Sequence, residues 1–148
     1  MVFDLNKCVN YITANKTKKI SEVFGDWLKD YDITRIQWIA LYFISTRDNL
    51  TQRDLANLMA INDSSVMRLI DRLERDGLVE RVKTLNDRRK TSLILSIKGS
   101  ELMDKVIHFG EDFNAVLTRN INPSDLDTFL KVQNQMLENV LNDKGSKK

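Results

Sequence analysis

Apolar residues recur at helical spacing along the first part of the chain. Between residues 5 and 29 most of them lie three or four positions apart, with the polar stretch TANKTKK in the middle. This pattern predicts one long or interrupted helix. The segment YDIT then breaks the pattern, and Thr34 can cap a second helix, RIQWIALYFIST. Apolar residues almost encircle this second helix, so we expect it to be buried.

Two shorter helices are predicted next. In LTQRDLANLMAI, Thr51 and Asp54 resemble a capping box, although Glu or Gln is the usual partner. Asn62 is the expected cap of a fourth helix, DSSVMRLIDRLERDG, and Gly77 ends that helix in the position that favours glycine. The two helices and the turn between them predict a helix-turn-helix.

A β-hairpin and two more helices complete the pattern. The runs LVERV and TSLILSI predict two strands around the loop LNDRRK. Ser96 can cap a helix from about residue 98 to residue 119, whose apolar positions are close to a heptad pattern. Asn122 and Pro123 then begin the last helix as its cap and first residue. This order predicts a mainly α fold, a winged helix-turn-helix with long flanking helices.

The composition of the 148-residue chain is that of a globular protein, with 42% hydrophobic and 30% charged residues. The sequence has no transmembrane stretch and no signal-peptide pattern, so we expect no membrane contact. A lone cysteine excludes an internal disulfide framework, and a reducing cytoplasm is the expected location. Because no nucleophile, phosphate-loop or metal-ligand motif occurs, we expect neither an enzyme nor a cofactor or metal site.

Positive charge is concentrated in the hairpin, although the net charge of the whole chain is only +2. From residue 81 to residue 98, six Lys or Arg residues stand against Asp87 alone. Phosphates are the natural partner of such a patch. An arginine at the hairpin tip can enter a narrow minor groove, and Asp87 could orient it through a bidentate pair. A solubilising turn is the alternative interpretation of this loop.

The fourth helix has one apolar and one polar face at 100° per residue. The face predicted to point into the core contains Val66, Leu69, Ile70 and Leu73. The outward face contains Ser64, Arg68, Asp71 and Arg75, with Ser65, Met67 and Arg72 on its flanks. Small hydroxyl residues and an arginine in the first half favour contact with base edges in a major groove. The alternative is a solvated face with a local ion pair between Asp71 and Arg75.

At this point the sequence resembles a known family, over residues 33 to 103. The run DRLERDGLVER, the NDRR loop before a strand and the lysine-glycine start of the next helix are similar to the winged helix-turn-helix of MarR-type bacterial transcription regulators. The segment ITRIQWIALYFI is similar to the second helix of that family. The resemblance implies one domain over residues 1–148. Within it we expect a DNA-binding unit at 34–97, dimerisation helices at 1–33 and 98–142, and a disordered tail at 143–148.

The resemblance also implies a homodimer that binds a roughly palindromic operator in double-stranded DNA, with Arg89 in the minor groove beside Asp87. We expect a repressor whose DNA affinity is lowered by a small molecule. The residues expected to contact DNA are Ser64, Ser65, Arg68, Arg72, Asp87, Arg88, Arg89 and Lys90. A winged-helix module that binds proteins and not DNA is the alternative.

Aromatic residues gather around the first two helices, where MarR-type regulators often have a cleft for small aromatic effectors. The candidate effector residues are Trp27, Tyr31, Trp38, Tyr42 and His108. A packed core is the competing interpretation of the same residues. Cys8 invites comparison with the hydroperoxide-sensing branch of the family, so redox sensing is a further alternative, although structural cysteines are commoner.

Overall fold

The computed structural model describes residues 2–84 and 87–143, and the side chains of these residues except 84 and 87–89. Its chain forms two compact units, residues 1–111 and residues 112–148. Among the described residues, no helix has the length and apolar character needed to cross a membrane.

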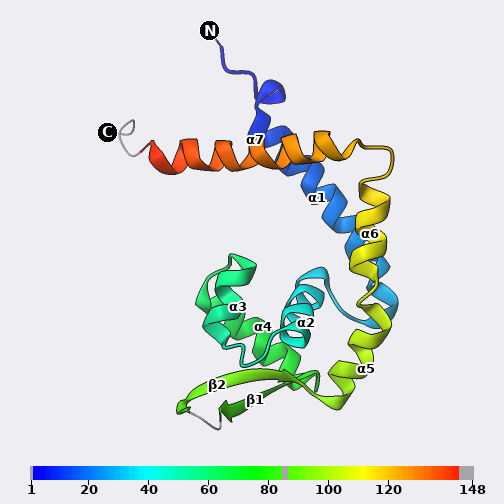
Figure 1. The fold of residues 1–148 in the computed structure, drawn as a ribbon, viewed down its shortest axis with the longest axis vertical. Coiled ribbons are helices and arrows are strands. Elements are labelled where there is room, and N and C mark those ends of the chain that lie inside the picture. The colour runs from blue at the N-terminus through cyan, green and yellow to red at the C-terminus, as the bar shows by residue number, and fades with distance from the viewer. Residues whose placement is uncertain (1, 85–86, 144–148) are drawn as a thin grey trace. The chain divides into compact units, whose positions relative to one another are not determined.

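The first unit contains helices and one hairpin (Figure 1). Short 3-10 helices η1 and η2 precede and follow the helix α1, and four further helices, α2 to α5, each contact the strand β1 or β2. The bounds are η1 Leu5–Lys7, α1 Val9–Trp27, η2 Lys29–Tyr31, α2 Arg35–Thr46, α3 Gln52–Met59, α4 Asp63–Arg75, β1 Val79–Thr84, β2 Asp87–Leu95 and α5 Ile97–Val106. Helix α6 (Phe109–Leu117) begins in this unit and ends in the second one.

Helix starts follow the predicted caps. The side chains of the five predicted cap residues each accept a hydrogen bond from a backbone N–H of the first turn, and these residues are Thr34, Thr51, Asn62, Ser96 and Asn122. Asp54 does complete a capping box with Thr51, as predicted. Gly77 follows α4 with φ of +75°, a left-handed conformation that favours glycine. Local sequence therefore determines where most of the helices begin.

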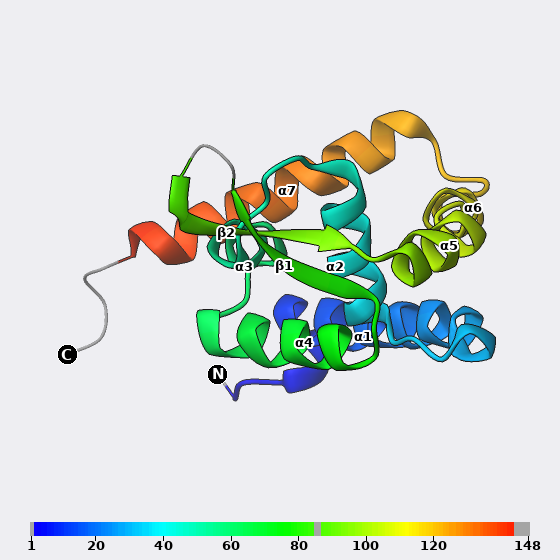
Figure 2. The same ribbon diagram turned by 90° about the horizontal axis from the view of Figure 1, so that it is seen from below.

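The hairpin is a two-stranded antiparallel sheet with Val79 opposite Leu95 and Lys83 opposite Thr91. Its strands reach farther toward the loop than predicted, to Thr84 and from Asp87, with an irregular register after Lys83. A backbone hydrogen bond of 2.8 Å from Leu93 N to Leu50 O attaches β2 to the segment before α3. Strand β1 lies next to α4, and β2 lies next to α2 and α3 (Figure 2). The hairpin is thus anchored to the helix-turn-helix that α3 and α4 form.

The core of the first unit is built from one apolar face of each helix and from the inner face of the hairpin. Val66, Ile70 and Leu73 of α4 are fully buried, as predicted, and Leu69 is half-buried. Further fully buried side chains come from α2, α3, β2 and α5: Leu41, Leu55, Leu93 and Val106. Burial of this face fixes which side of α4 is turned outward.

One helix prediction is decided by the structure, and another needs correction. The polar stretch TANKTKK lies inside the uninterrupted helix α1, which agrees with the long-helix alternative, and short 3-10 helices flank its two ends. The helix predicted from residue 98 to residue 119 is two helices, because α5 ends at Val106 and α6 begins at Phe109. At this break the backbone carbonyl of Val106 accepts a hydrogen bond from the indole of Trp38.

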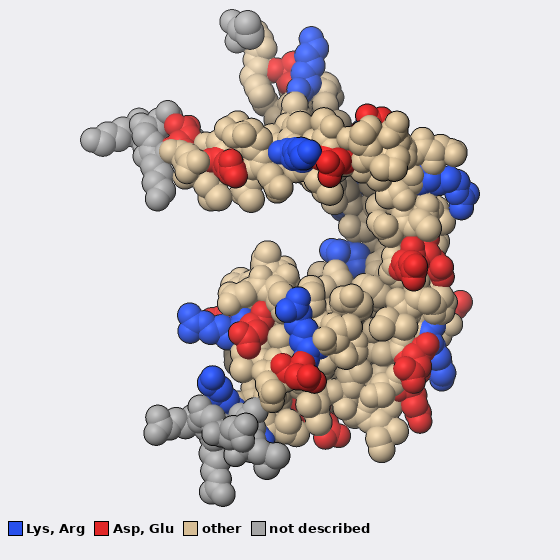
Figure 3. Space-filling model, viewed as in Figure 1, with Lys and Arg blue, Asp and Glu red and all other residues tan. Residues whose placement is uncertain are grey.

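The second unit contains helix α7 (Pro123–Asn142), which begins at the predicted Asn122 cap and Pro123. None of its residues is buried. Large apolar side chains stay exposed along it: Phe129, Leu130, Val132, Met136, Leu137, Val140 and Leu141. Most of the α7 surface visible in Figure 3 is neither acidic nor basic. A helix with this much apolar surface needs a partner to cover it.

Candidate nucleic-acid interface

The first turn of α4 presents two serines held by one cap. Asn62 Oδ1 accepts hydrogen bonds from Ser65 N and from Ser64 Oγ, both at 2.8 Å. Ser64 is exposed and Ser65 is half-buried. Because the proton of Ser64 is directed to Asn62, its hydroxyl oxygen remains available as an acceptor toward an outside ligand.

The rest of the outward face of α4 is mostly charged. Arg68, Arg72 and Arg75 are exposed, as the helical spacing predicts. Met67 lies on the flank of this face with 49% of its surface exposed, although it is apolar. Three arginines and one exposed apolar side chain on a helix anchored by its opposite face are suited to a polyanion with apolar groups in its grooves.

Asp71 is not paired with Arg75, as the alternative interpretation of the α4 face supposed. Its carboxylate accepts a bond of 2.6 Å from Arg81 Nη2, on strand β1, and not from Arg75. Arg81 also pairs with Glu74 of α4 and bonds to Gln52 of α3. The helical spacing could not reveal this contact, because its partners come from another element.

The wing, which we define as β1, β2 and the loop between them, contributes Lys90 and Lys83 as exposed cations. Lys83 Nζ donates to Thr91 Oγ1 of the opposite strand at 3.2 Å. The backbone of Asp87, Arg88 and Arg89 belongs to β2, but the side chains of these three predicted contact residues lie outside those described.

The N-terminal end of α3 lies close to Lys90 of the wing. Thr51 donates to the Asp54 carboxylate from its hydroxyl at 2.6 Å and from its backbone N–H at 3.0 Å. These hydrogen bonds, the side-chain bond first, lower the pKa of Asp54, and the nearby charges of Lys90 and Arg53 lower it further. Lys90 and Arg53 therefore share one neighbourhood at the N-terminal end of α3, where backbone N–H groups also favour anions.

The five predicted effector residues fall into two groups. Trp38 is buried and stacks on the exposed Tyr42, with ring centroids 5.5 Å apart, and its edge meets Phe24. The other three residues, Trp27, Tyr31 and His108, each make an edge-to-face contact with Phe109. Trp38 is thus part of the core, in agreement with the competing interpretation for this residue. Tyr31 also lines a cavity of about 710 Å³, whose charged lining residues are Lys98, Lys105, Asp30, Asp32, Asp76 and Glu101.

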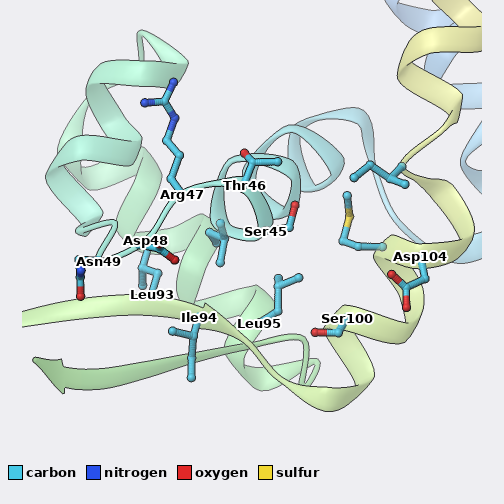
Figure 4. A pocket seen from close by; sticks show the side chains of 13 residues that line it. Ser45, Thr46, Arg47, Asp48, Asn49, Leu93, Ile94, Leu95, Ser100 and Asp104 are labelled. Carbon is cyan, nitrogen blue, oxygen red and sulfur yellow. The ribbon is translucent and has the colours of Figure 1, made fainter.

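A second cavity, of about 700 Å³, lies between the end of α2, the following loop, β2 and α5 (Figure 4). Its lining includes Leu93 and Met103, together with the carboxylates of Asp48 and Asp104. Arg47 extends away from the other labelled side chains (Figure 4). Acidic groups without an inward-pointing cation disfavour a carboxylate ligand here.

Cys8 is half-buried at the N-cap of α1. Among the described residues, no three His, Cys, Asp or Glu side chains converge as a metal site would require.

Comparison with known proteins gives a family match over the middle of the chain. Residues 31–90 match the model of the MarR family. The chain is 27% identical to the HTH-type transcriptional regulator YsmB of Bacillus subtilis over 139 residues, which cover 91% of this chain and 92% of that protein. Over residues 31–90 the chain is therefore similar to the MarR family.

Solved structures of other regulators share the fold. The S. aureus MepR–DNA complex matches with a TM-score of 0.81 at 20% identity, over 90% of this chain and 96% of that one. Bordetella bronchiseptica BpsR, whose DNA binding is regulated by 6-hydroxynicotinic acid, matches with a TM-score of 0.79 at 19% identity, over 92% and 97%. Similarity to these transcription regulators identifies this chain as a DNA-binding transcription regulator and not an enzyme.

Proposed function

We propose that this protein is a dimeric, sequence-specific repressor of the MarR family that binds a pseudo-palindromic operator and works in the cytoplasm. The observation that carries the proposal is the outward face of α4, where two serines and three arginines stand on a helix whose opposite face buries Val66, Ile70 and Leu73. A rigid helix of this kind can enter a major groove without losing its own packing.

The proposal gives the predicted residues separate roles. Ser64, Ser65 and Arg68, in the first half of α4, approach base edges, and Arg72 reaches the adjacent phosphates. In the wing, Lys90 and Arg88 contact phosphates, and Arg89 enters the minor groove with Asp87 as its orienting partner. Lys90 is exposed and lies close to the N-terminus of α3, and both observations support its contact with a phosphate.

A homodimer is supported by apolar surface at both ends of the chain. In α7, Leu137 is 56% and Val140 is 71% exposed, and in α1, Val9 is 54% and Val23 is 49% exposed. Two copies that cover these helices would present two α4 helices to two half-sites about one helical turn apart. A single chain would leave this surface in water.

We also propose that a small aromatic molecule relieves repression. BpsR, which has the same fold, is regulated by 6-hydroxynicotinic acid, and that molecule is a planar aromatic acid. In the present chain Trp27, Tyr31 and His108 around Phe109 are the favoured contacts, since aromatic rings gather there and Tyr31 lines a cavity. Tyr42 is exposed, but its stacking partner Trp38 is buried.

The test of DNA binding begins with selection of an operator from a random duplex pool, followed by affinity measurements over a range of salt. Each phosphate contact adds about 0.9 to the slope of log affinity against log salt. Lys90→Ala should lower that slope by about one unit on all sequences. Arg89→Ala should weaken operator binding by about 1–3 kcal/mol, and the loss should be largest where A·T pairs flank the site. A protein-interaction module would not bind duplex DNA, so no salt-dependent affinity would be measured.

The effector test is a titration with planar aromatic acids. Tryptophan fluorescence and operator affinity are measured at each concentration of the acid. Saturable quenching together with loss of DNA affinity supports the proposal, and Tyr31→Ala should weaken both. Absence of both effects across a broad panel would contradict it. Oxidation of Cys8 with peroxide, compared with a Cys8→Ser variant, would then test redox sensing.

A further inference from the structure

Arg81 is the side chain that joins three elements of the helix-turn-helix. It leaves strand β1, and its Nη2 lies 2.6 Å from Asp71 Oδ1 of α4. Its Nη1 pairs with the carboxylate of Glu74, one turn farther along the same helix. Its Nε and Nη2 both donate to Gln52 Oε1 of α3, at 3.2 and 3.1 Å. All three guanidinium nitrogens are therefore engaged by α3 and α4.

The Arg81 side chain is less exposed than its two acidic partners on α4. The Arg81 side chain is 25% exposed, whereas those of Asp71 and Glu74 are 57% and 42% exposed. Isolated exposed ion pairs contribute little to stability. Here one planar fork binds groups on two helices, and this geometry adds orientation as well as attraction. Arg81 thus differs from the other wing cations, although the sequence counts it among them.

The opposite side of the same strand pair is fixed as well. Arg81 is paired in register with Leu93, which is buried, and Leu93 N donates to Leu50 O at 2.8 Å. The loop lies beyond this point: β1 ends at Thr84, three positions after Arg81, and Thr84 is paired with Asp87 of β2. Three extended residues span about 10 Å, so a rotation of 10° at Arg81 would move the start of the loop by roughly 2 Å. A shift of that size is enough to break a hydrogen bond of about 2.9 Å.

We infer that Arg81 is a positioning residue for DNA binding, which holds the wing and α4 in one fixed geometry and makes no phosphate contact itself. The inference rests on the proposed DNA-binding function. It assigns the Arg81 charge to Asp71, Glu74 and Gln52, and it makes operator recognition depend on these three partners.

The central experiment compares Arg81→Gln, Arg81→Lys and the double variant Asp71→Asn/Glu74→Gln on the selected operator and on random duplex. Lys83→Gln is the matched control, because Lys83 is an exposed cation two positions farther along the same strand. Circular dichroism and thermal unfolding establish that each variant is folded at the temperature of the binding assay.

Both Arg81 variants should weaken operator binding at least tenfold while the salt slope stays within half a unit of the wild-type value. Lys83→Gln should show a smaller effect on affinity that is the same for both duplexes. The double variant should also weaken operator binding, although it removes two negative charges. General electrostatics predicts the reverse, tighter binding, so this variant separates positioning from charge.

The inference is overturned if Arg81→Lys binds as wild type does, if Arg81→Gln mainly lowers the salt slope, or if the double variant binds the operator more tightly. Loss of folding in all three variants would also overturn it, since Arg81 would then be a stability residue. Wild-type protein that binds no duplex would instead contradict the proposed function. The two failures are therefore distinguishable.

Discussion

The indole of Trp38 donates a hydrogen bond to the backbone carbonyl of Val106, with 2.9 Å between Nε1 and the oxygen. Val106 is the last residue of α5, and in a continuous helix its carbonyl would accept from the N–H of Gly110. Gly110 N lies instead 3.4 Å from Ile107 O. A Cβ atom on Gly110 would lie 2.6 Å from Trp38 Cη2. Trp38 therefore takes the helical acceptor and occupies the space beside Gly110.

This contact predicts that Gly110→Ala destabilises the protein by about 1–3 kcal/mol, because the added methyl forces the indole to shift. Urea unfolding followed by circular dichroism measures the change. Gly25→Ala is the matched control, since no atom lies within 4 Å of a Cβ there and alanine favours the helix α1. In a Trp38→Phe background the shorter ring lacks Cη2, so the Gly110→Ala penalty should shrink. Equal penalties in both backgrounds would contradict the explanation.

The same contact explains which part of the fold could be predicted from the sequence. Helix caps are local, because Thr34, Asn62 and Ser96 bond within three residues, and their positions were predicted correctly. The break after Val106 depends on a residue 68 positions away. The pattern of apolar residues between 98 and 119 contains no sign of it, so a single long helix was predicted.

The candidate site divides in the same way. The outward face of α4 follows from helical periodicity alone, and the exposure of Ser64, Arg68 and Arg75 agrees with it. The role of Arg81 does not follow, because a charge count cannot separate a paired guanidinium from an exposed one. Its partners lie 7, 10 and 29 positions away along the chain.

The cap of α3 predicts a specific dependence of stability on pH. Hydrogen bonds from Thr51 lower the pKa of Asp54 in the folded protein. A lowered pKa contributes stability that is present above the unfolded value, about 4, and is lost as pH falls through the folded value. Thr51→Ala should therefore cost about 0.5–2 kcal/mol at pH 7, and the difference from wild type should shrink on acidification below about pH 4. Urea unfolding at several pH values measures this difference. A difference that stays constant down to pH 3 would contradict the assignment.

The exposed face of α7 predicts that charged substitutions there dissociate the dimer. Leu137→Glu places a carboxylate on a position that is 56% exposed in one chain and that we expect to be covered by the partner. Light scattering should give twice the 17.2 kDa mass of one chain for wild type and a monomer mass for the variant at micromolar concentration. Gln135→Glu, on the same helix but about 160° away from Leu137 around its axis, is the control for charge alone. Wild-type protein that remains a monomer at high concentration would rule out the dimer.

The exposed apolar side chain of Met67 leads us to predict a contact with a thymine in the major groove. It is the large apolar side chain that α4 leaves exposed, at 49%, and it lies one position before Arg68 on the half of the helix proposed to approach bases. Thymine is the base that presents a methyl group in that groove.

Replacing thymine by uracil at single operator positions removes only this methyl group. At the contacted position we expect a loss of about 0.8 kcal/mol, or roughly fourfold in affinity, for wild-type protein. Met67→Ala should bind both duplexes equally, because the partner of the methyl is gone, whereas Met67→Leu should keep the preference. If no uracil position lowers wild-type affinity, or if Met67→Ala keeps the full preference, then Met67 is an exposed side chain without a role in base recognition.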